Sequence, residues 1–144
     1  MTTSRFRLPS AVHLFLLHGS EVLLLLRHNT GYEDGKYSVI AGHLEGNETI
    51  HAAARREAME EAGIIIQPQD LQVVGVMHRR EGDERIDWFL AARKWQNTIR
   101  NMEPQKCRHL RWFALDQLPP NMVAYVRRAL DNFQQGRWFD SFGW

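Results

Sequence analysis

Residues 42–64 of the chain read GHLEGNETIHAAARREAMEEAGI, and this stretch carries most of the information about the fold. Residues 48–62 contain no Gly or Pro and are rich in Ala and Glu, so we predict a helix that stops at Gly63. Gly42 and Gly46 lie just before this helix, where they allow a tight turn and a close approach of the backbone to a ligand or an ion.

The side of this helix that should pack on the core ends in acidic residues. At about 100° per residue, the apolar side chains of Ile50, Ala53 and Ala54 fall on one side of the helix. The same side continues into three carboxylates, those of Glu57, Glu60 and Glu61. Like charges at this spacing repel one another, burial raises their cost, and the helix dipole disfavours anions near the C-terminal end. A hard divalent cation such as Mg²⁺ relieves this conflict, so the pattern favours a metal site over a solvated acidic face.

Two further polar residues belong to the segment. Arg56 lies one turn before Glu60 and can hold a carboxylate in place, and Glu48 is favoured by the helix dipole. The segment resembles the Nudix box of the Nudix hydrolase family, which reads Gly, five residues, Glu, seven residues, Arg-Glu, an aliphatic residue, any residue, Glu-Glu, any residue, Gly and an aliphatic residue. The matching residues are Gly42, Glu48, Arg56, Glu57, Ala58, Glu60, Glu61, Gly63 and Ile64. Only Ala58 is smaller than the residue common at its position.

The resemblance implies an α/β fold, namely an α/β/α sandwich with a mixed β-sheet between helices, formed by residues 1–144 as a single domain. It also implies Mg²⁺-dependent hydrolysis of a nucleoside diphosphate linked to another group, with Mn²⁺ as a substitute. The metal ligands that it implies are Glu57, Glu60, Glu61 and the backbone carbonyl of Ala41. It makes Glu57 a candidate general base and gives Arg56 the task of orienting the carboxylates. The supporting residues are Gly42, Glu48 and Gly63.

Residues outside the box are expected to complete the site, because many members of this family use one more carboxylate. Glu103, in a polar loop, is the first choice for this ligand, and Glu84 and Asp83 in a predicted hairpin turn are the alternatives. Arg79 and Arg85 flank the same turn and are candidates for binding substrate phosphates.

The rest of the chain predicts strands and one more helix. Residues 11–17 and 22–26 predict two buried strands joined by a tight hairpin. Further strands are predicted over residues 37–40, 71–78, 86–92 and 110–114, with a turn at 81–84. A last helix opens at Pro119-Pro120-Asn121. Strands mixed with two separate helices indicate a layered α/β or α+β domain.

Composition and charge limit the other classes of protein. The 144 residues are 44% hydrophobic and 24% charged, as is usual for a globular domain. Lys and Arg number 18 against 17 Asp and Glu, a net charge of +1, which disfavours nucleic acid or an anionic membrane as a partner. A single Cys, Cys107, excludes an intrachain disulfide, and a cytoplasmic location is the simplest expectation. The apolar runs are too short for a membrane span, and none resembles a cleavable leader.

The expected partner is a small-molecule nucleotide. The leading function is hydrolysis of a nucleoside or deoxynucleoside triphosphate to the monophosphate and pyrophosphate. The alternatives are hydrolysis of ADP-ribose or another nucleotide sugar, removal of an RNA cap or triphosphate end, and nucleotide sensing without turnover. A complete set of box carboxylates argues against the last of these. Two Trp and two Phe in residues 137–144 predict a tail that packs on the domain or across a homodimer.

Overall fold

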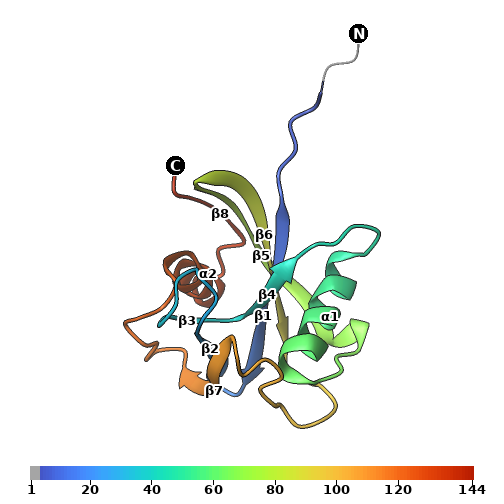
Figure 1. The fold of residues 1–144 in the computed structure, drawn as a ribbon, viewed down its shortest axis with the longest axis vertical. Helices are drawn as coiled ribbons and strands as arrows, with labels where there is room; N and C mark the ends of the chain where they lie inside the picture. Colours follow the sequence, from blue (N-terminus) through green and yellow to red (C-terminus); the bar gives the residue numbers. More distant parts are fainter. Residues whose placement is uncertain (1–3) are drawn as a thin grey trace.

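The computed structural model describes residues 4–144, which form a mixed β-sheet with one helix on each side (Figure 1). The elements are β1 (Ser10–His18), β2 (Glu21–Arg27), β3 (Tyr37–Ser38), β4 (Ile40–His43), α1 (Ile50–Ala62), a 3-10 turn η1 (Pro68–Asp70), β5 (Leu71–Glu81), β6 (Asp83–Ala92), β7 (Cys107–Ala114), α2 (Ala124–Gln135) and β8 (Phe139–Phe142). Residues 4–9 extend away from the body. The predicted α/β/α sandwich is confirmed. No helix in the described part of the chain is long and apolar enough to cross a membrane.

The central strand of the sheet is β1. It pairs in parallel with β6, from Ser10 opposite Ile86 to Leu16 opposite Ala92. On its other edge, β4 pairs antiparallel with the first half of β1, and β2 pairs with its last two residues in the predicted hairpin. The strand order is β3-β2-β1-β6-β5-β8, with β4 attached to β1 and β7 attached to β2. The strand β4 therefore ends beside β1 at the point where the chain turns towards α1.

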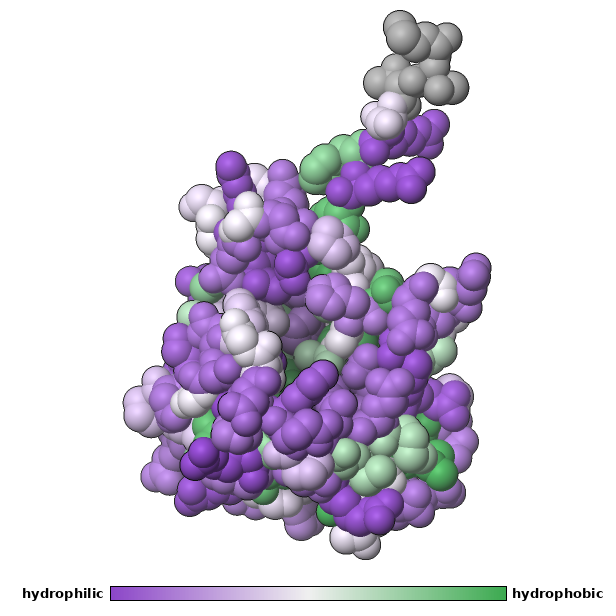
Figure 2. Space-filling model, viewed as in Figure 1, coloured by the Kyte–Doolittle hydropathy of each residue, from purple (hydrophilic) through white to green (hydrophobic). Residues whose placement is uncertain are grey.

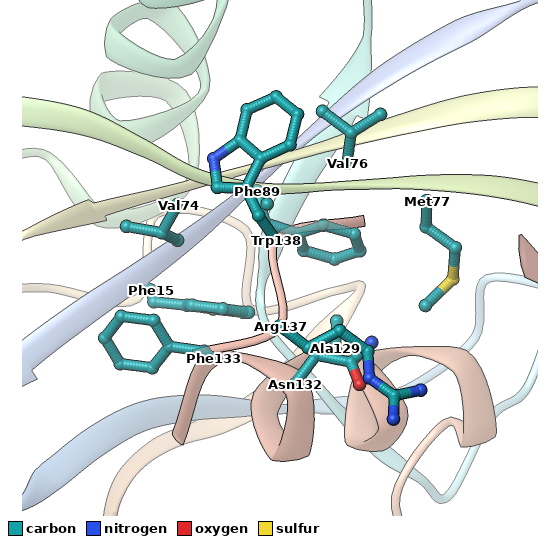
Figure 3. A pocket seen from close by; sticks show the side chains of 11 residues that line it. Phe15, Val74, Val76, Met77, Phe89, Ala129, Asn132, Phe133, Arg137 and Trp138 are labelled. Atoms are coloured by element: carbon teal, nitrogen blue, oxygen red, sulfur yellow. The ribbon is translucent and has the colours of Figure 1, made fainter. Parts of the chain in front are cut away.

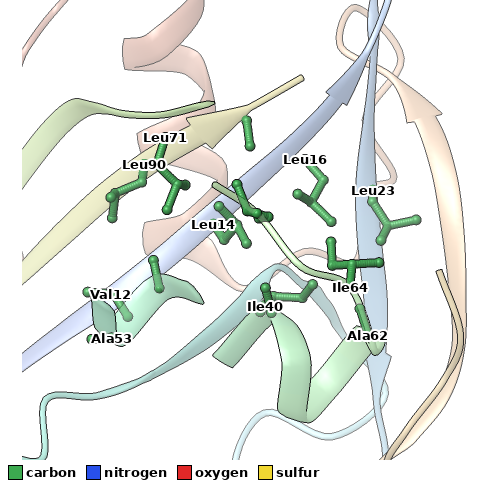
Figure 4. Packing of buried hydrophobic residues seen from close by; sticks show 14 of the residues in the cluster. Val12, Leu14, Leu16, Leu23, Ile40, Ala53, Ala62, Ile64, Leu71 and Leu90 are labelled. Carbon is green, nitrogen blue, oxygen red and sulfur yellow. The ribbon is translucent and has the colours of Figure 1, made fainter. Parts of the chain in front are cut away.

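Alternation along β1 divides the core into two layers, because successive side chains point to opposite faces of a strand. Val12, Leu14 and Leu16 belong to the cluster beneath α1, which Figure 4 shows. Phe15 and Leu17 belong to the cluster beneath α2. Each helix is thus held by its own apolar layer on one shared strand.

The boundaries of α1 follow from local signals. Thr49 is the N-cap, and its hydroxyl accepts a hydrogen bond from the backbone N–H of Ala52 at 3.0 Å, so the helix begins two residues later than predicted. Gly63 ends the helix in the left-handed conformation with φ 68°, as predicted. Ala58 is fully buried against the sheet. Its small side chain lets the helix backbone lie close to the strands.

Two predicted elements begin or end elsewhere because of partners distant in sequence. The predicted strand over residues 37–40 is interrupted at Val39, so that β3 pairs with β2 and β4 pairs with β1. The helix α2 begins at Ala124 rather than at the prolines before it. The segment between them pairs with β3 instead: the N–H of Tyr37 donates to Asn121 O at 2.8 Å, and the N–H of Val123 donates to Tyr37 O at 2.9 Å.

The hairpin of β5 and β6 is longer than predicted. Its strands extend to Glu81 and Asp83, so the turn is at Gly82 with φ 83° rather than over residues 81–84. This extension places Arg79 and Arg85 inside paired strands, where they lie directly opposite each other.

A strand that the sequence did not predict, β8, fixes the C-terminal tail to the sheet. It pairs in parallel with residues 76–79 of β5, and Trp144 Nε1 donates to His78 O at 3.0 Å. The tail therefore packs on its own domain, which is one of the two predicted arrangements. Backbone pairing is the main attachment of the tail, since three of its aromatic side chains remain 55–58% exposed: Trp138, Phe139 and Trp144.

The space between α2 and the sheet is filled by aromatic side chains. The ring of Phe15 lies 5.6 Å from that of Phe89 and 5.7 Å from that of Phe133, measured between centroids (Figure 3). The cavity that remains there is about 10 Å³, at the lower limit for one water molecule. This region is core packing rather than a binding site.

Candidate active site

The carboxylate of Glu57 lies against the backbone of β4. Glu57 is on the sheet-facing side of α1 and is only 9% exposed. Opposite it stands Gly42, where an added Cβ would overlap the Glu57 carboxylate. The φ of Gly42 is not among the positive values. The glycine is therefore needed for the space it leaves to the carboxylate and not for an unusual backbone conformation.

Arg56 joins the helix to the turn before it. Its Nη1 donates to Glu57 Oε1 at 2.7 Å, and its Nε and Nη2 donate to the two carboxylate oxygens of Glu48 at 3.1 and 3.0 Å. Nη2 also donates to the carbonyl of His43 at 3.2 Å. The hydrogen bonds from Arg56 hold the pKa of Glu48 below its ordinary value. One guanidinium thus fixes Glu57 relative to the turn.

Glu61 is one turn further along α1 on the same side. Its Oε2 accepts a hydrogen bond from the backbone N–H of Ala41 at 3.2 Å. Burial raises the pKa of Glu61 well above its ordinary value, and the nearby carboxylates of Glu57 and Glu103 raise it further. A second negative charge is therefore costly at this position unless a cation or a proton compensates it.

Glu60 does not join the other box carboxylates, contrary to the expectation of a common buried side. Its side chain is 52% exposed and lies 3.6 Å from Arg56 Nη1. Three residues along a helix rotate a side chain by about 300°, so Glu60 is at the rim of the face that Glu57 and Glu61 share. Within residues 4–144, no three His, Cys, Asp or Glu side chains stand close enough to hold an ion together without rearrangement.

The donors nevertheless fit a hard divalent cation. The side chains gathered at Ala41 and Gly42 are carboxylates, which Mg²⁺ and Mn²⁺ prefer as ligands. Because Gly42 has no side chain, the Glu57 carboxylate has space directly beside the backbone of β4. The raised pKa of Glu61 is the electrostatic sign of negative charges that a cation would relieve.

Of the three carboxylates considered from outside the box, Glu103 lies nearest to these groups. It lines a cavity of about 250 Å³ together with Glu61. The alternatives are engaged in the β5–β6 hairpin, where Glu84 is 3.2 Å from His78 Nε2 and Asp83 is 2.8 Å from Arg85 Nη2. The structure thus places Glu103 at the 250 Å³ cavity beside Glu61, and it places Asp83 and Glu84 elsewhere.

A second cavity, of about 390 Å³, opens on the other side of the box turn. Ala41, Gly42 and His43 form the wall nearest the carboxylates. Arg27 borders both this cavity and the one beside Glu61. The face in Figure 2 is hollowed near its centre and bordered by hydrophilic residues. We refer to this 390 Å³ space, the larger of the two cavities that border the box, as the larger cavity.

Arg79 and Arg85 both line the larger cavity, but their environments differ from the exposed turn that the sequence suggested. Arg79 is only 4% exposed, its Nε donates to Asp87 Oδ2 at 2.6 Å, and its guanidinium carbon lies 3.6 Å from the ring centroid of Tyr125. Its depth arises because the two strands continue past the expected turn. Arg85 is nearer the surface and is bound by Asp83.

His13 and Tyr125 are wall residues that the sequence analysis did not select. His13 Nε2 lies 2.9 Å from the hydroxyl of Tyr125, and both residues are buried. Burial lowers the pKa of His13 to about 4, which the nearby Asp87 opposes only in part, so the imidazole is neutral at pH 7. One signal was present in the sequence, since a His within the apolar run 11–17 and an Asp within the strand at 86–92 are polar residues at buried positions.

Comparison with known proteins agrees with this fold and assigns the chain to a family. The model of the NUDIX domain family matches residues 7–133, and the chain therefore belongs to the Nudix family. It is a Nudix hydrolase, and members of this family generally use a divalent metal. The expectation drawn from the box at residues 42–64 is thereby confirmed for the family and for the class of enzyme.

Individual relatives differ in how much of their length is matched. The chain is 29% identical over 123 residues to the NAD-capped RNA hydrolase NudC of Shigella flexneri, and 28% identical to that of Escherichia coli O9:H4 (strain HS). The match covers 76% of this chain but 42% of each relative, so the chain spans about two fifths of their length. Among solved structures, a MutT NUDIX hydrolase from Burkholderia pseudomallei has a TM-score of 0.80 at 24% identity, covering 88% of this chain and 98% of its own. A MutT protein from Bacillus halodurans has a TM-score of 0.74 at 19% identity, covering 93% and 88%. These structures share the fold.

Proposed function

We propose that the protein is a Mg²⁺-dependent pyrophosphohydrolase of nucleoside or deoxynucleoside triphosphates, which releases the monophosphate and pyrophosphate. The observation that carries this proposal is the pair of carboxylates, Glu57 and Glu61, at the backbone of Ala41 and Gly42, where the larger cavity begins. A small-molecule nucleotide placed there has its anhydride at the carboxylates and its nucleoside in the cavity. The proposed compartment is the cytoplasm, where the single free thiol, Cys107, is in keeping with a reducing environment.

The carboxylates and arginines of the site have separate tasks in this proposal. Glu57, Glu60, Glu61, Glu103 and the carbonyl of Ala41 would hold the metal, which supplies charge neutralisation and an acidified water when it is bound. Glu57 accepts the proton of the attacking water, since its buried carboxylate is oriented by Arg56. Arg27 and Arg85, on the walls of the larger cavity, balance the charge of the substrate phosphates.

A second candidate is hydrolysis of a nucleotide joined to a second large group, such as ADP-ribose. The name of the NudC relatives as NAD-capped RNA hydrolases and the 250 Å³ cavity beyond Arg27 favour this candidate. Nucleotide binding without turnover is a third outcome, in which the fold is kept and the chemistry is lost.

One screen separates these candidates. Purified protein is incubated with MgCl₂ or with EDTA and a panel of nucleoside triphosphates, ADP-ribose and NAD, and the release of pyrophosphate, phosphate and monophosphate is measured. We expect pyrophosphate and monophosphate from a triphosphate, with no release in EDTA. Glu57→Gln is the control for catalysis by the box. Turnover of ADP-ribose or NAD but of no triphosphate would replace the proposal with the second candidate, and binding without release would replace it with the third.

The metal has a readout that does not depend on turnover. An ion that binds only the folded chain stabilises it by mass action. We therefore expect MgCl₂ or MnCl₂ to raise the melting temperature more than NaCl at equal ionic strength, and to do so less in Glu57→Gln. Equal melting temperatures in MgCl₂ and NaCl would contradict a preformed cation site.

A further inference from the structure

The larger cavity has two chemically different ends. At the box end, Ala41, Gly42 and His43 lie beside the carboxylates. At the far end, the wall is formed by Arg79 and Tyr125, which come from β5 and α2. Under the proposed function, phosphates occupy the box end, so the nucleobase of the same molecule reaches the far end.

Arg79 is held in a single orientation at that end. Asp87, which is fully buried, accepts from Nε at 2.6 Å and from Nη2 at 3.4 Å, and Glu81 accepts from Nη1 at 3.0 Å. The guanidinium also stacks over the ring of Tyr125, with 3.6 Å between the guanidinium carbon and the ring centroid. A rigid, planar donor of this kind loses little rotational freedom when it binds a ligand.

Two donors of Arg79 remain for a ligand. A guanidinium has five N–H groups, and the three hydrogen bonds to Asp87 and Glu81 use one on each nitrogen. One N–H on Nη1 and one on Nη2 thus have no acceptor among the residues that the structure describes. Neighbouring guanidinium nitrogens pair with two acceptors that lie side by side on one planar group.

The surroundings of Arg79 suit a planar base rather than another phosphate. Tyr32 lines the cavity and is 48% exposed, so its ring is available to stack on a base, whereas the ring of Tyr125 is covered by the Arg79 guanidinium. Arg79 already carries Asp87 and Glu81 as counter-ions. The positive charge of Arg79 is therefore already balanced, and its remaining N–H groups suit the neutral edge of a base.

We propose that Arg79 determines base specificity by donating two hydrogen bonds to a nucleobase that carries two adjacent acceptor atoms, with Asp87 as its positioning residue. This inference rests on the proposed function for the location of the phosphates. Guanine presents such a pair at O6 and N7, and cytosine presents one at O2 and N3. Adenine has an amino donor beside N7, and uracil has an N–H between its two carbonyls, so both are disfavoured.

Binding of nucleoside monophosphates tests this inference without any turnover. Calorimetry measures the affinities of GMP, CMP, AMP and UMP for the full chain. Two analogues then test whether guanine is the base: 7-deaza-GMP lacks the N7 acceptor, and IMP keeps both O6 and N7. We expect GMP or CMP to bind about tenfold or more tighter than AMP and UMP. If guanine is the base, IMP retains this affinity and 7-deaza-GMP loses it; if cytosine is the base, CMP alone is favoured.

Variants assign the preference to Arg79. Arg79→Lys keeps the charge but loses the fork, so the preference should fall to about twofold or less. The change in activity should then appear in KM for the favoured triphosphate, with kcat little changed. The matched control is Arg128→Lys, because Arg128 also pairs with an Asp and lies over an aromatic ring, but on the surface of α2. Its preference should equal that of the unmodified chain.

Loss of the Arg79 guanidinium leaves the buried Asp87 carboxylate without its partner, which can destabilise the fold. A second variant is therefore included. Arg79→Gln with Asp87→Asn removes both charges together and should keep the fold while abolishing the preference. Equal affinities for all four monophosphates in the unmodified chain would overturn the inference, as would an unchanged preference in either Arg79 variant. Absence of triphosphate hydrolysis with a retained GMP or CMP preference would instead reject the proposed reaction and leave the role of Arg79 standing.

Discussion

At the scale of the residue, the site is a set of charges that burial makes costly and that fixed neighbours hold together. Glu57 is held by Arg56 and fits only because Gly42 has no side chain. Glu61 has a raised pKa because it is buried beside Glu57. Such an arrangement costs free energy of folding, and the cation of the proposed function would offset this cost.

Replacing Glu61 by Gln tests this view. Glu61→Gln keeps the shape of the side chain and removes its charge, so kcat should fall by at least about 10²-fold at saturating Mg²⁺. The melting temperature without metal should be equal or higher, because a buried carboxylate is no longer opposed by its neighbours. The control is Asp116→Asn, an exposed acid in the loop after β7. Turnover close to that of the unmodified chain would show that Glu61 has no role in catalysis.

His13 gives the protein a defined response to acid. Its pKa is lowered to about 4 in the folded chain, chiefly by burial, against 6.5 unfolded. Between these values the unfolded chain binds a proton that the folded chain does not, so the free energy of unfolding falls as the pH is lowered from 6.5 to 4. The loss attributable to His13 is about 3 kcal/mol, from about 1.4 kcal/mol per pH unit.

Urea unfolding at several pH values measures this loss. In His13→Gln the decline between pH 6.5 and 5 should be shallower than in the unmodified chain, because the titrating group is absent. The carboxylates with lowered pKa, such as Glu48 and Asp140, act at lower pH and are common to both proteins. Parallel declines in the two proteins would show that His13 is not the group responsible.

At the scale of the element, β4 and α1 work as one unit, and their contact is the steric fit between Gly42 and Glu57. Gly42→Ala adds a methyl group that overlaps the Glu57 carboxylate, so this carboxylate must leave its position beside β4 or the strand must shift. We expect the melting temperature to fall by several degrees, on the order of 2 kcal/mol of stability, and the activity to be lost. The same change made in a Glu57→Ala background should cost much less, because the overlapping atoms are gone. Equal costs in the two backgrounds would contradict the steric explanation.

Elements with local signals could be predicted from the sequence, and elements defined by distant partners could not. The helix α1 is marked by Ala-rich sequence and Gly63, and β1 and β2 by apolar runs, and all three were predicted within two residues. The strand β8 has no such pattern, since its pairing with β5 is set by the edge that β5 offers. The start of α2 depends in the same way on the pairing of the preceding segment with β3.

In the candidate site as well, residues with local sequence signals were predicted and residues brought together by distant pairing were not. The box residues were selected because their spacing within one helix and one turn is local. The far end of the larger cavity was not selected, because Arg79, His13 and Tyr125 come from three separate elements, and Asp87, which holds Arg79, comes from a fourth. Arg79 was expected to flank a turn, outside the strands, because the length of the β5–β6 hairpin depends on pairing that the sequence does not show. Its depth, and so its environment, followed from that length.

At the scale of the whole molecule, the sheet ends at β8, and the C-terminal tail protects the edge of β5. The tail is bound through its backbone along residues 76–79 and through Asp140, which lies 2.9 Å from both Arg128 Nη1 and Asn132 Nδ2. Gly143 contributes as well, because a Cβ there would overlap the carbonyl oxygen of Arg80. The exposed rings of the tail contribute less, since they remain largely in water.

A chain shortened to end at Gly136 should therefore lose stability but keep its choice of substrate. Removal of the tail leaves the backbone of β5 unpaired at residues 76–79, and exposed strand edges favour aggregation. We expect the melting temperature to fall by roughly 5–10 °C, or the protein to aggregate, when measured by calorimetry. Phe139→Thr removes an exposed ring but keeps the pairing, so its melting temperature should change by less than about 2 °C. The order of preference among nucleotides should be unchanged in both, because the larger cavity is lined by residues outside the tail. A shortened chain that melts like the full chain and binds one nucleotide selectively worse would place the tail in substrate recognition instead.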